Sequence, residues 1–113
     1  MSLQIEHKEI RPGVEVISLA GRVMLGNESA QIEAVVERLL KGGCRHVVFD
    51  LGGVTHIDST GIGRFISSLN KMRVAGGTLR MAAASGQVRD VFHVTRLDTV
   101  FKFDPDVDSA LQA

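Results

Sequence analysis

Tryptophan and tyrosine are absent from this chain of 113 residues, and it has only five phenylalanines. Proteins that read single-stranded nucleic acid stack the bases on aromatic side chains, so this composition argues against that function. Basic and acidic side chains are equally numerous, with 13 of each, and the positive surplus typical of nucleic-acid binders is missing. We therefore expect no nucleic acid among the partners.

Cysteine is also scarce. Cys44 is the only one, which excludes an internal disulfide and fits a reducing, cytoplasmic compartment. No stretch approaches the roughly 20 apolar residues of a bilayer-spanning helix, and the first residues contain no apolar signal core. The sequence thus predicts a cytoplasmic protein without membrane insertion. The four histidines lack metal-ligand spacing, and we expect neither a metal nor a cofactor.

What the sequence does contain is a regular succession of strand-like and helix-like segments. Alternating β-branched runs predict strands, and apolar side chains spaced three and four residues apart predict helices. Strands are expected at residues 3–10, 14–20, 46–51, 78–82 and near 100–103, and helices at 28–41, 60–75, 86–95 and from Pro105 onward. Asn27 and Ser85 are expected to cap the first and third of these helices.

The order of these segments predicts an α/β fold. The Pro12-Gly13 pair between the first two strands is typical of a hairpin, and the later strands are connected by helices through right-handed parallel crossovers. The expected result is a mixed, mostly parallel sheet with an N-terminal hairpin and about four helices. A chain of this length suits one domain, which we place at residues 1–113 with its core at about 4–112.

The segment from Asp58 to Gly63 is the most informative one. It joins a strand-like run to the start of the second predicted helix. Free backbone N–H groups and the positive end of the helix dipole converge at such a junction, so the fold would tolerate a phosphate on Ser59. As a dipeptide alone, Asp58-Ser59 fits an ordinary helix N-cap better than a modification site. Ser59 is a candidate for modification rather than for catalysis.

Catalytic motifs built from similar residues do not fit this segment. A nucleotide-binding phosphate loop requires Lys after its last glycine, and Gly63 is followed by Arg64. The serine elbow of hydrolases requires glycine two residues before the serine, where Ile57 stands. His56 need not reach Ser59 from a strand end, and a serine without a base is a weak nucleophile. We expect no enzyme, and a serine hydrolase stays a distant alternative.

Four stretches of the chain together resemble the STAS domain family: Gly21, Gly42-Gly43 with Arg45 to Leu51, Ile57 to Gly63, and Gly76 to Leu79. Within that family the chain looks like a stand-alone, bacterial anti-sigma factor antagonist, also called an anti-anti-sigma factor. The resemblance implies transcription regulation by partner switching. The unphosphorylated form would bind an anti-sigma factor that is a GHKL-type serine kinase, and so free the sigma factor. Phosphorylation of Ser59 would abolish binding, and a serine phosphatase would restore it.

The resemblance also implies a partner-binding surface around the motif, formed by Asp58, Ser59, Thr60, Gly61, Ile62, Gly63 and Arg64. We expect Asp58 to accept backbone hydrogen bonds, and Gly61 and Gly63 to leave the backbone open to a partner. We expect the exposed side of the helix to extend the surface through Arg64, Ser68 and Lys71.

One departure from the family pattern lies in the loop at residues 21–29, which is expected nearby. Many such antagonists carry Gly-Glu-Leu or Gly-Glu-Ile followed by Asp, whereas this chain has Gly21-Arg22-Val23-Met24. Arg22 and Met24 are therefore assigned to the partner-binding surface, but for a partner that can differ from the usual one.

Two other roles of STAS domains stay open. One is an interaction subunit of a lipid- or anion-transport complex, which a neighbouring permease or ATPase gene would favour. The other is a stressosome-like scaffold, which would form very large assemblies on gel filtration.

Overall fold

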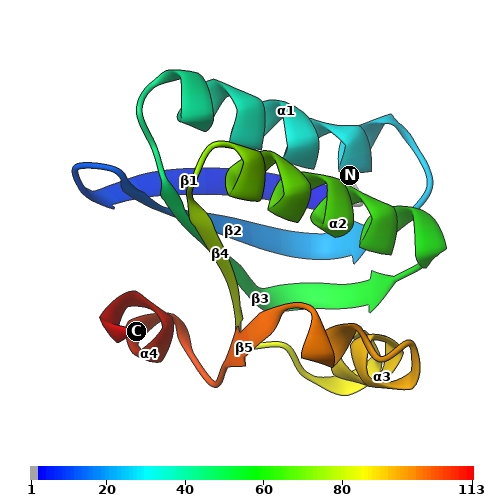
Figure 1. Ribbon diagram of the computed structural model, residues 1–113. Helices are drawn as coiled ribbons and strands as arrows, with labels where there is room; N and C mark the ends of the chain where they lie inside the picture. The colour runs from blue at the N-terminus through cyan, green and yellow to red at the C-terminus, as the bar shows by residue number, and fades with distance from the viewer. Residues whose placement is uncertain (1–2) are drawn as a thin grey trace.

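One five-stranded sheet organises the structure, a computed structural model that describes residues 3–113 (Figure 1). The strands lie in chain order and are β1 Leu3–Arg11, β2 Val14–Val23, β3 His46–Ile57, β4 Thr78–Ala82 and β5 Lys102–Asp104. The first two are antiparallel, and every later pair is parallel. Residues 1 and 2, which the predicted domain included, lie outside the described residues. The mixed sheet with an N-terminal hairpin is confirmed.

The helices are α1 Asn27–Lys41, α2 Ser59–Val74, α3 Gly86–Val94 and α4 Val107–Gln112, with a short 3₁₀ helix, η1, at Leu97–Thr99. The first two lie side by side over one face of the sheet (Figure 1). α3 adds Val88 and Phe92 to the core on that side. α4 covers part of the opposite face, where Ala110 packs in a smaller cluster with Val16 and Val48.

The phenylalanines converge in the main core. Phe49 on β3 meets Phe65 on α2 edge to face, with the ring centroids 5.1 Å apart. Phe92 on α3 then contacts Phe65, Phe101 and Phe103 at centroid distances of 6.1, 5.6 and 5.2 Å. Such ring pairs add about 0.5–1.5 kcal/mol each beyond the burial of their surface. They hold α2 in place on the sheet, and thereby fix where its first turn lies.

Two predicted details of the helix starts are corrected. Asn27 does not cap α1, because the N-cap position belongs to Gly26, which has a φ of 142° that favours glycine. α4 begins at Val107 instead of Pro105, and Asp106 caps it by accepting a hydrogen bond from the backbone N–H of Ser109 at 2.7 Å. Ser85 does occupy the N-cap position of α3, although its side chain makes no capping hydrogen bond.

The last strand is also displaced from its predicted place. Residues 97–99 form η1, which follows Arg96 in the left-handed region at a φ of 62°. The chain therefore reaches the sheet later than its apolar pattern suggested, and β5 spans Lys102–Asp104 instead of residues 100–103. Phe101 is nevertheless buried in the core, which is why its segment looked like a strand.

Candidate functional site

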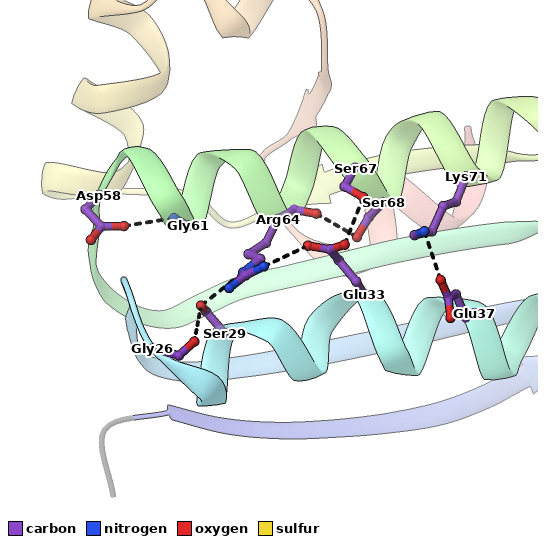
Figure 2. Close-up of polar contacts among 10 residues, drawn as sticks. All are labelled: Gly26, Ser29, Glu33, Glu37, Asp58, Gly61, Arg64, Ser67, Ser68 and Lys71. Atoms are coloured by element: carbon purple, nitrogen blue, oxygen red, sulfur yellow. Dashed lines mark hydrogen bonds and ion pairs between the residues drawn. The ribbon is translucent and has the colours of Figure 1, made fainter.

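The candidate site lies where α2 begins, at the carboxyl end of β3 and beside the end of β2. Asp58 is the N-cap residue and has extended backbone angles. Its backbone N–H donates to the carbonyl oxygen of Val23 at 3.3 Å, which ties this junction to β2. Its carboxylate oxygen Oδ1 accepts from the backbone N–H of Gly61 at 2.8 Å (Figure 2). Asp58 thus accepts a backbone hydrogen bond, as the sequence predicts.

The second carboxylate oxygen of Asp58 reaches a different segment. Oδ2 accepts from the backbone N–H of Leu25 at 2.9 Å, so one side chain bridges the first turn of α2 and the loop that precedes α1. Partial burial acts to raise the pKa of Asp58, but hydrogen bonds from the backbone N–H groups, led by those of Gly61 and Leu25, outweigh it and hold the pKa below its ordinary value. Asp58 is therefore ionised at neutral pH.

Ser59 is the first residue of α2 and its side chain is exposed. Within residues 3–113 its hydroxyl engages in no hydrogen bond, so another molecule can reach it without first breaking one. Thr60, the next residue, is half-buried. The first N–H groups of a helix have no partner inside the helix, and Ser59 lies among them. The position suits an added anion.

The two glycines of the motif differ in their surroundings. A Cβ at Gly61 would overlap the carbonyl oxygen of Val23 and come within 2.9 Å of the Ile57 side chain. Gly61 is buried, so the expectation that it leaves the backbone open to a partner is wrong; it lets α2 approach β2. A Cβ at Gly63 would meet nothing within 4 Å, and this glycine is open to a partner as expected. Ile62 lies in the core with 8% exposure.

The side of α2 that carries Arg64 faces α1 (Figure 2). Arg64 donates from Nε to the Ser29 hydroxyl at 3.2 Å and from Nη1 to Glu33 at 3.3 Å. Lys71 forms an ion pair with Glu37 at 2.9 Å. The expectation that Ser68 lies on the exposed side is wrong, because it is fully buried and donates to the carbonyl oxygen of Arg64 at 2.8 Å.

The loop predicted at residues 21–29 is shorter in the structure and spans residues 24–26, because β2 extends to Val23 and α1 begins at Asn27. It lies beside the motif, since the Leu25 backbone N–H donates to Asp58. Arg22, at the end of β2, is exposed and pairs in register with His56. Met24 is 37% exposed and Leu25 is 80% exposed. Leu25 was not among the predicted site residues, because a single apolar residue in a glycine-flanked loop belongs to no periodic pattern. The sequence did contain one indication of its role. Leu25 directly follows Arg22-Val23-Met24, the segment that departs from the family pattern.

His56 is exposed and its Nδ1 lies 3.0 Å from the hydroxyl oxygen of its neighbour Thr55. Over residues 3–113, no group of three or more His, Cys, Asp or Glu side chains is arranged to hold a metal ion. In the same part of the chain, no helix is long and apolar enough to cross a membrane.

A family model for the STAS domain matches residues 7–110. Among solved structures, the fold is similar to an anti-sigma factor antagonist from Mycobacterium paratuberculosis, with a TM-score of 0.83 at 22% identity over 98% of this chain and 92% of that one. It is also similar to the anti-sigma factor antagonist SpoIIAA in its unphosphorylated form, with a TM-score of 0.75 at 17% identity over 96% of both chains. The Bacillus protein in its phosphorylated form gives the same TM-score and identity over 96% of this chain and 97% of that one.

A further likeness is to part of a much larger protein. The murine anion transporter Slc26a9 matches with a TM-score of 0.77 at 14% identity, over 92% of this chain but only 18% of the transporter. At such identities these likenesses show the fold alone.

Proposed function

Because the chain belongs to the STAS domain family, we propose that it is a non-enzymatic anti-sigma factor antagonist that acts by partner switching. The unphosphorylated form binds an anti-sigma factor serine kinase of the GHKL type and thereby frees a sigma factor. The kinase phosphorylates Ser59, which ends binding, and a serine phosphatase restores it. The observation that carries the proposal is the exposed hydroxyl of Ser59 in the first turn of α2, which forms no hydrogen bond within residues 3–113.

The electrostatics of this position support a switch that leaves the fold intact. A phosphate adds about 1.5 to 2 negative charges. At a helix N-terminus it gains about 0.3–1 kcal/mol from the dipole at a surface site. At a partner interface the same dianion must lose water, and it stands one residue from the Asp58 carboxylate. If phosphorylation reduces the binding free energy by about 3–4 kcal/mol, the affinity for the partner falls by a factor of about 100 to 1,000.

The proposed binding surface divides into residues that contact the partner and residues that position them. Ser59, Gly63, Arg22 and Met24 are exposed and are assigned to contact. Five others, less exposed, support the first turn of α2 and its attachment to the preceding loop and α1: Asp58, Thr60, Gly61, Ile62 and Arg64. The similar fold of a protein solved in a phosphorylated form is consistent with phosphorylation here.

The test uses the purified kinase-type anti-sigma factors encoded in the same genome, with binding measured by isothermal titration calorimetry. We expect one of them to bind the wild-type protein and Ser59→Ala, and to bind Ser59→Asp about 100-fold or more weakly. Ser85→Asp is the matched control, because Ser85 is an exposed serine at the N-terminus of another helix. Its binding stays at the wild-type level. Circular dichroism must show all variants folded, and equal binding of Ser59→Asp and Ser59→Ala contradicts the proposal.

A second candidate is an interaction subunit of a transport complex, which the likeness to part of an anion transporter favours. In that case the protein binds a transport component and Ser59 serves as a helix-terminal residue only. Retention of a transporter subunit by both wild type and Ser59→Asp would favour this role.

A further inference from the structure

We infer that Arg22, Met24 and Leu25, which lie at the end of β2 and just after it and are here called the anchor loop, form a contact surface whose partner presents an apolar pocket bordered by carboxylates. Leu25 enters the pocket and Arg22 meets its acidic border. The inference rests on the proposed function, since it describes the partner whose binding Ser59 controls. Three observations carry it: the exposure of two neighbouring apolar side chains, the hydrogen bonds that hold this part of the chain, and an exposed cation that forms no ion pair with the described carboxylates of residues 3–113.

The first observation is the exposure of Leu25 and Met24, at 80% and 37%. Single exposed apolar side chains are common on protein surfaces and need no explanation. The other large exposed apolar side chains in residues 3–113 occur singly on different segments: Ile10, Val74, Val94 and Val100. Met24 and Leu25 alone are adjacent in the chain, and they lie next to the proposed switch.

The second observation is that hydrogen bonds hold this exposed loop. The Leu25 backbone N–H donates to Asp58 Oδ2 at 2.9 Å, and the Ser29 hydroxyl donates to the carbonyl oxygen of Gly26 at 3.1 Å. Ser29 is buried and in turn accepts from Arg64 at 3.2 Å. The anchor loop is thus tied to the N-cap residue of α2, Asp58, and the residue that follows the loop, Gly26, is tied to Arg64 of α2 by way of Ser29. A surface ordered in advance loses less conformational entropy on binding, which suits an anchor residue.

The third observation is the charge of Arg22. It is exposed, and no carboxylate forms an ion pair with it within residues 3–113. The nearby carboxylate of Asp58 is already engaged by two backbone N–H groups. A partner that places carboxylates opposite Arg22 gains complementarity without having to displace an existing ion pair. A basic partner surface at the same place would be repelled.

A membrane surface is the other occupant that an apolar side chain and a cation would suit. Clusters of about four to eight basic residues are typical of segments that bind anionic lipids. The anchor loop contains a single basic residue, Arg22, and so the charges favour a protein.

The test uses the anti-sigma factor kinase that binds the wild-type protein in the experiment described above. Its binding to the variants Leu25→Ser and Arg22→Glu is measured. Both changes are at exposed positions, and thermal unfolding checks that both variants fold. We expect each to weaken binding about tenfold or more, as for an interface anchor. Two matched controls lie at the far end of α2: Val74→Ser at an apolar side chain with 90% exposure, and Arg73→Glu at an exposed cation. Both should bind within about twofold of wild type. Changing a carboxylate of the partner to Lys should restore binding of Arg22→Glu.

The outcomes separate this inference from the proposed function. If Ser59→Asp loses binding while Leu25→Ser and Arg22→Glu bind like wild type, the inference is wrong and the proposed function stands. If no kinase-type anti-sigma factor binds the wild-type protein, both are wrong. Co-sedimentation with phosphatidylglycerol vesicles that is lost in Leu25→Ser would overturn the protein partner in favour of a membrane.

Discussion

At the scale of single residues, the motif depends on two glycines that the sequence presents as equivalent. The structure separates them. Gly61 is required by the close approach of α2 to the end of β2, whereas Gly63 faces open space. Their roles in stability are therefore opposite, although both belong to the same six-residue segment.

We predict that Gly61→Ala and Gly63→Ala change the free energy of unfolding in opposite directions. The methyl group at residue 61 would overlap a backbone carbonyl oxygen that cannot yield without moving β2, so we expect a loss of about 1–3 kcal/mol or more. At residue 63, the higher helix propensity of alanine should add up to about 1 kcal/mol. Urea denaturation of both variants measures the two effects. Equal stability of the variants would contradict the assigned packing.

Asp58 is the residue through which the loop and the helix are joined. Asp58→Ala removes the N-cap and should lower the free energy of unfolding by about 1 kcal/mol. Asp58→Asn keeps a hydrogen-bond acceptor but cannot ionise. Comparing it with the wild type therefore shows how the ionisation of Asp58 makes the free energy of unfolding depend on pH.

The sign of that pH dependence follows from the lowered pKa of Asp58. A carboxyl whose pKa is lower in the folded state stabilises the fold above its ordinary value of 3.8, and this stabilisation is lost as the pH falls through the folded-state pKa. The stability difference between wild type and Asp58→Asn should therefore shrink on acidification below 3.8. Asp106 also has a lowered pKa but is present in both proteins, so its effect cancels. A difference that stays constant with pH would contradict the assignment.

At the scale of elements, α1 and α2 are joined by polar contacts as well as by the core. The carboxylate of Glu33 accepts from Arg64 at 3.3 Å and from Ser67 at 3.0 Å (Figure 2). These contacts come from the second and third turns of α2. Arg64 also donates to Ser29, which donates to the carbonyl oxygen of Gly26. These bonds connect α2 to the chain just after the anchor loop.

We predict a measurable coupling between Glu33 and Arg64 in a double-mutant cycle. Both side chains are about one quarter exposed, at 26% and 27%, so the pair should contribute about 0.5–1 kcal/mol and weaken in high salt. The Glu37–Lys71 pair connects the same helices but Glu37 is 52% exposed, and it should show the smaller coupling. The reverse order would contradict the view that Arg64 is the main polar connection between these helices.

The sequence was informative about elements and less so about their polar faces. The spacing of apolar residues and the positions of the glycines predicted the hairpin and the parallel crossovers. They also predicted the start of α2 at Ser59 to within one residue. A pattern of apolar residues does not reveal a serine that is buried among them. Ser68 follows Phe65 by three residues and precedes Met72 by four, so it lies on the buried side of α2 and was misplaced. The 3₁₀ helix before β5 depends on a non-glycine residue with positive φ, Arg96, which no local pattern indicates.

At the scale of the whole molecule, the topology places the switch and the anchor loop together. β2 and β3 are parallel neighbours, so their carboxyl ends meet at one edge of the sheet. The loop that leaves β2 and the helix that leaves β3 therefore begin side by side, and Asp58 bridges them. Residues more than 30 positions apart in sequence thus form one surface. The proposed phosphorylation of Ser59 would act on this surface without disturbing the core.

The most direct test of partner switching through Ser59 is to incubate the purified protein with ATP in an extract of its own cells and map phosphopeptides by mass spectrometry. Partner switching predicts one added phosphoryl group on Ser59, none on Ser59→Ala, and a GHKL-type kinase retained by the unmodified form only. A phosphate at another residue, or a kinase retained equally by both forms, would contradict it.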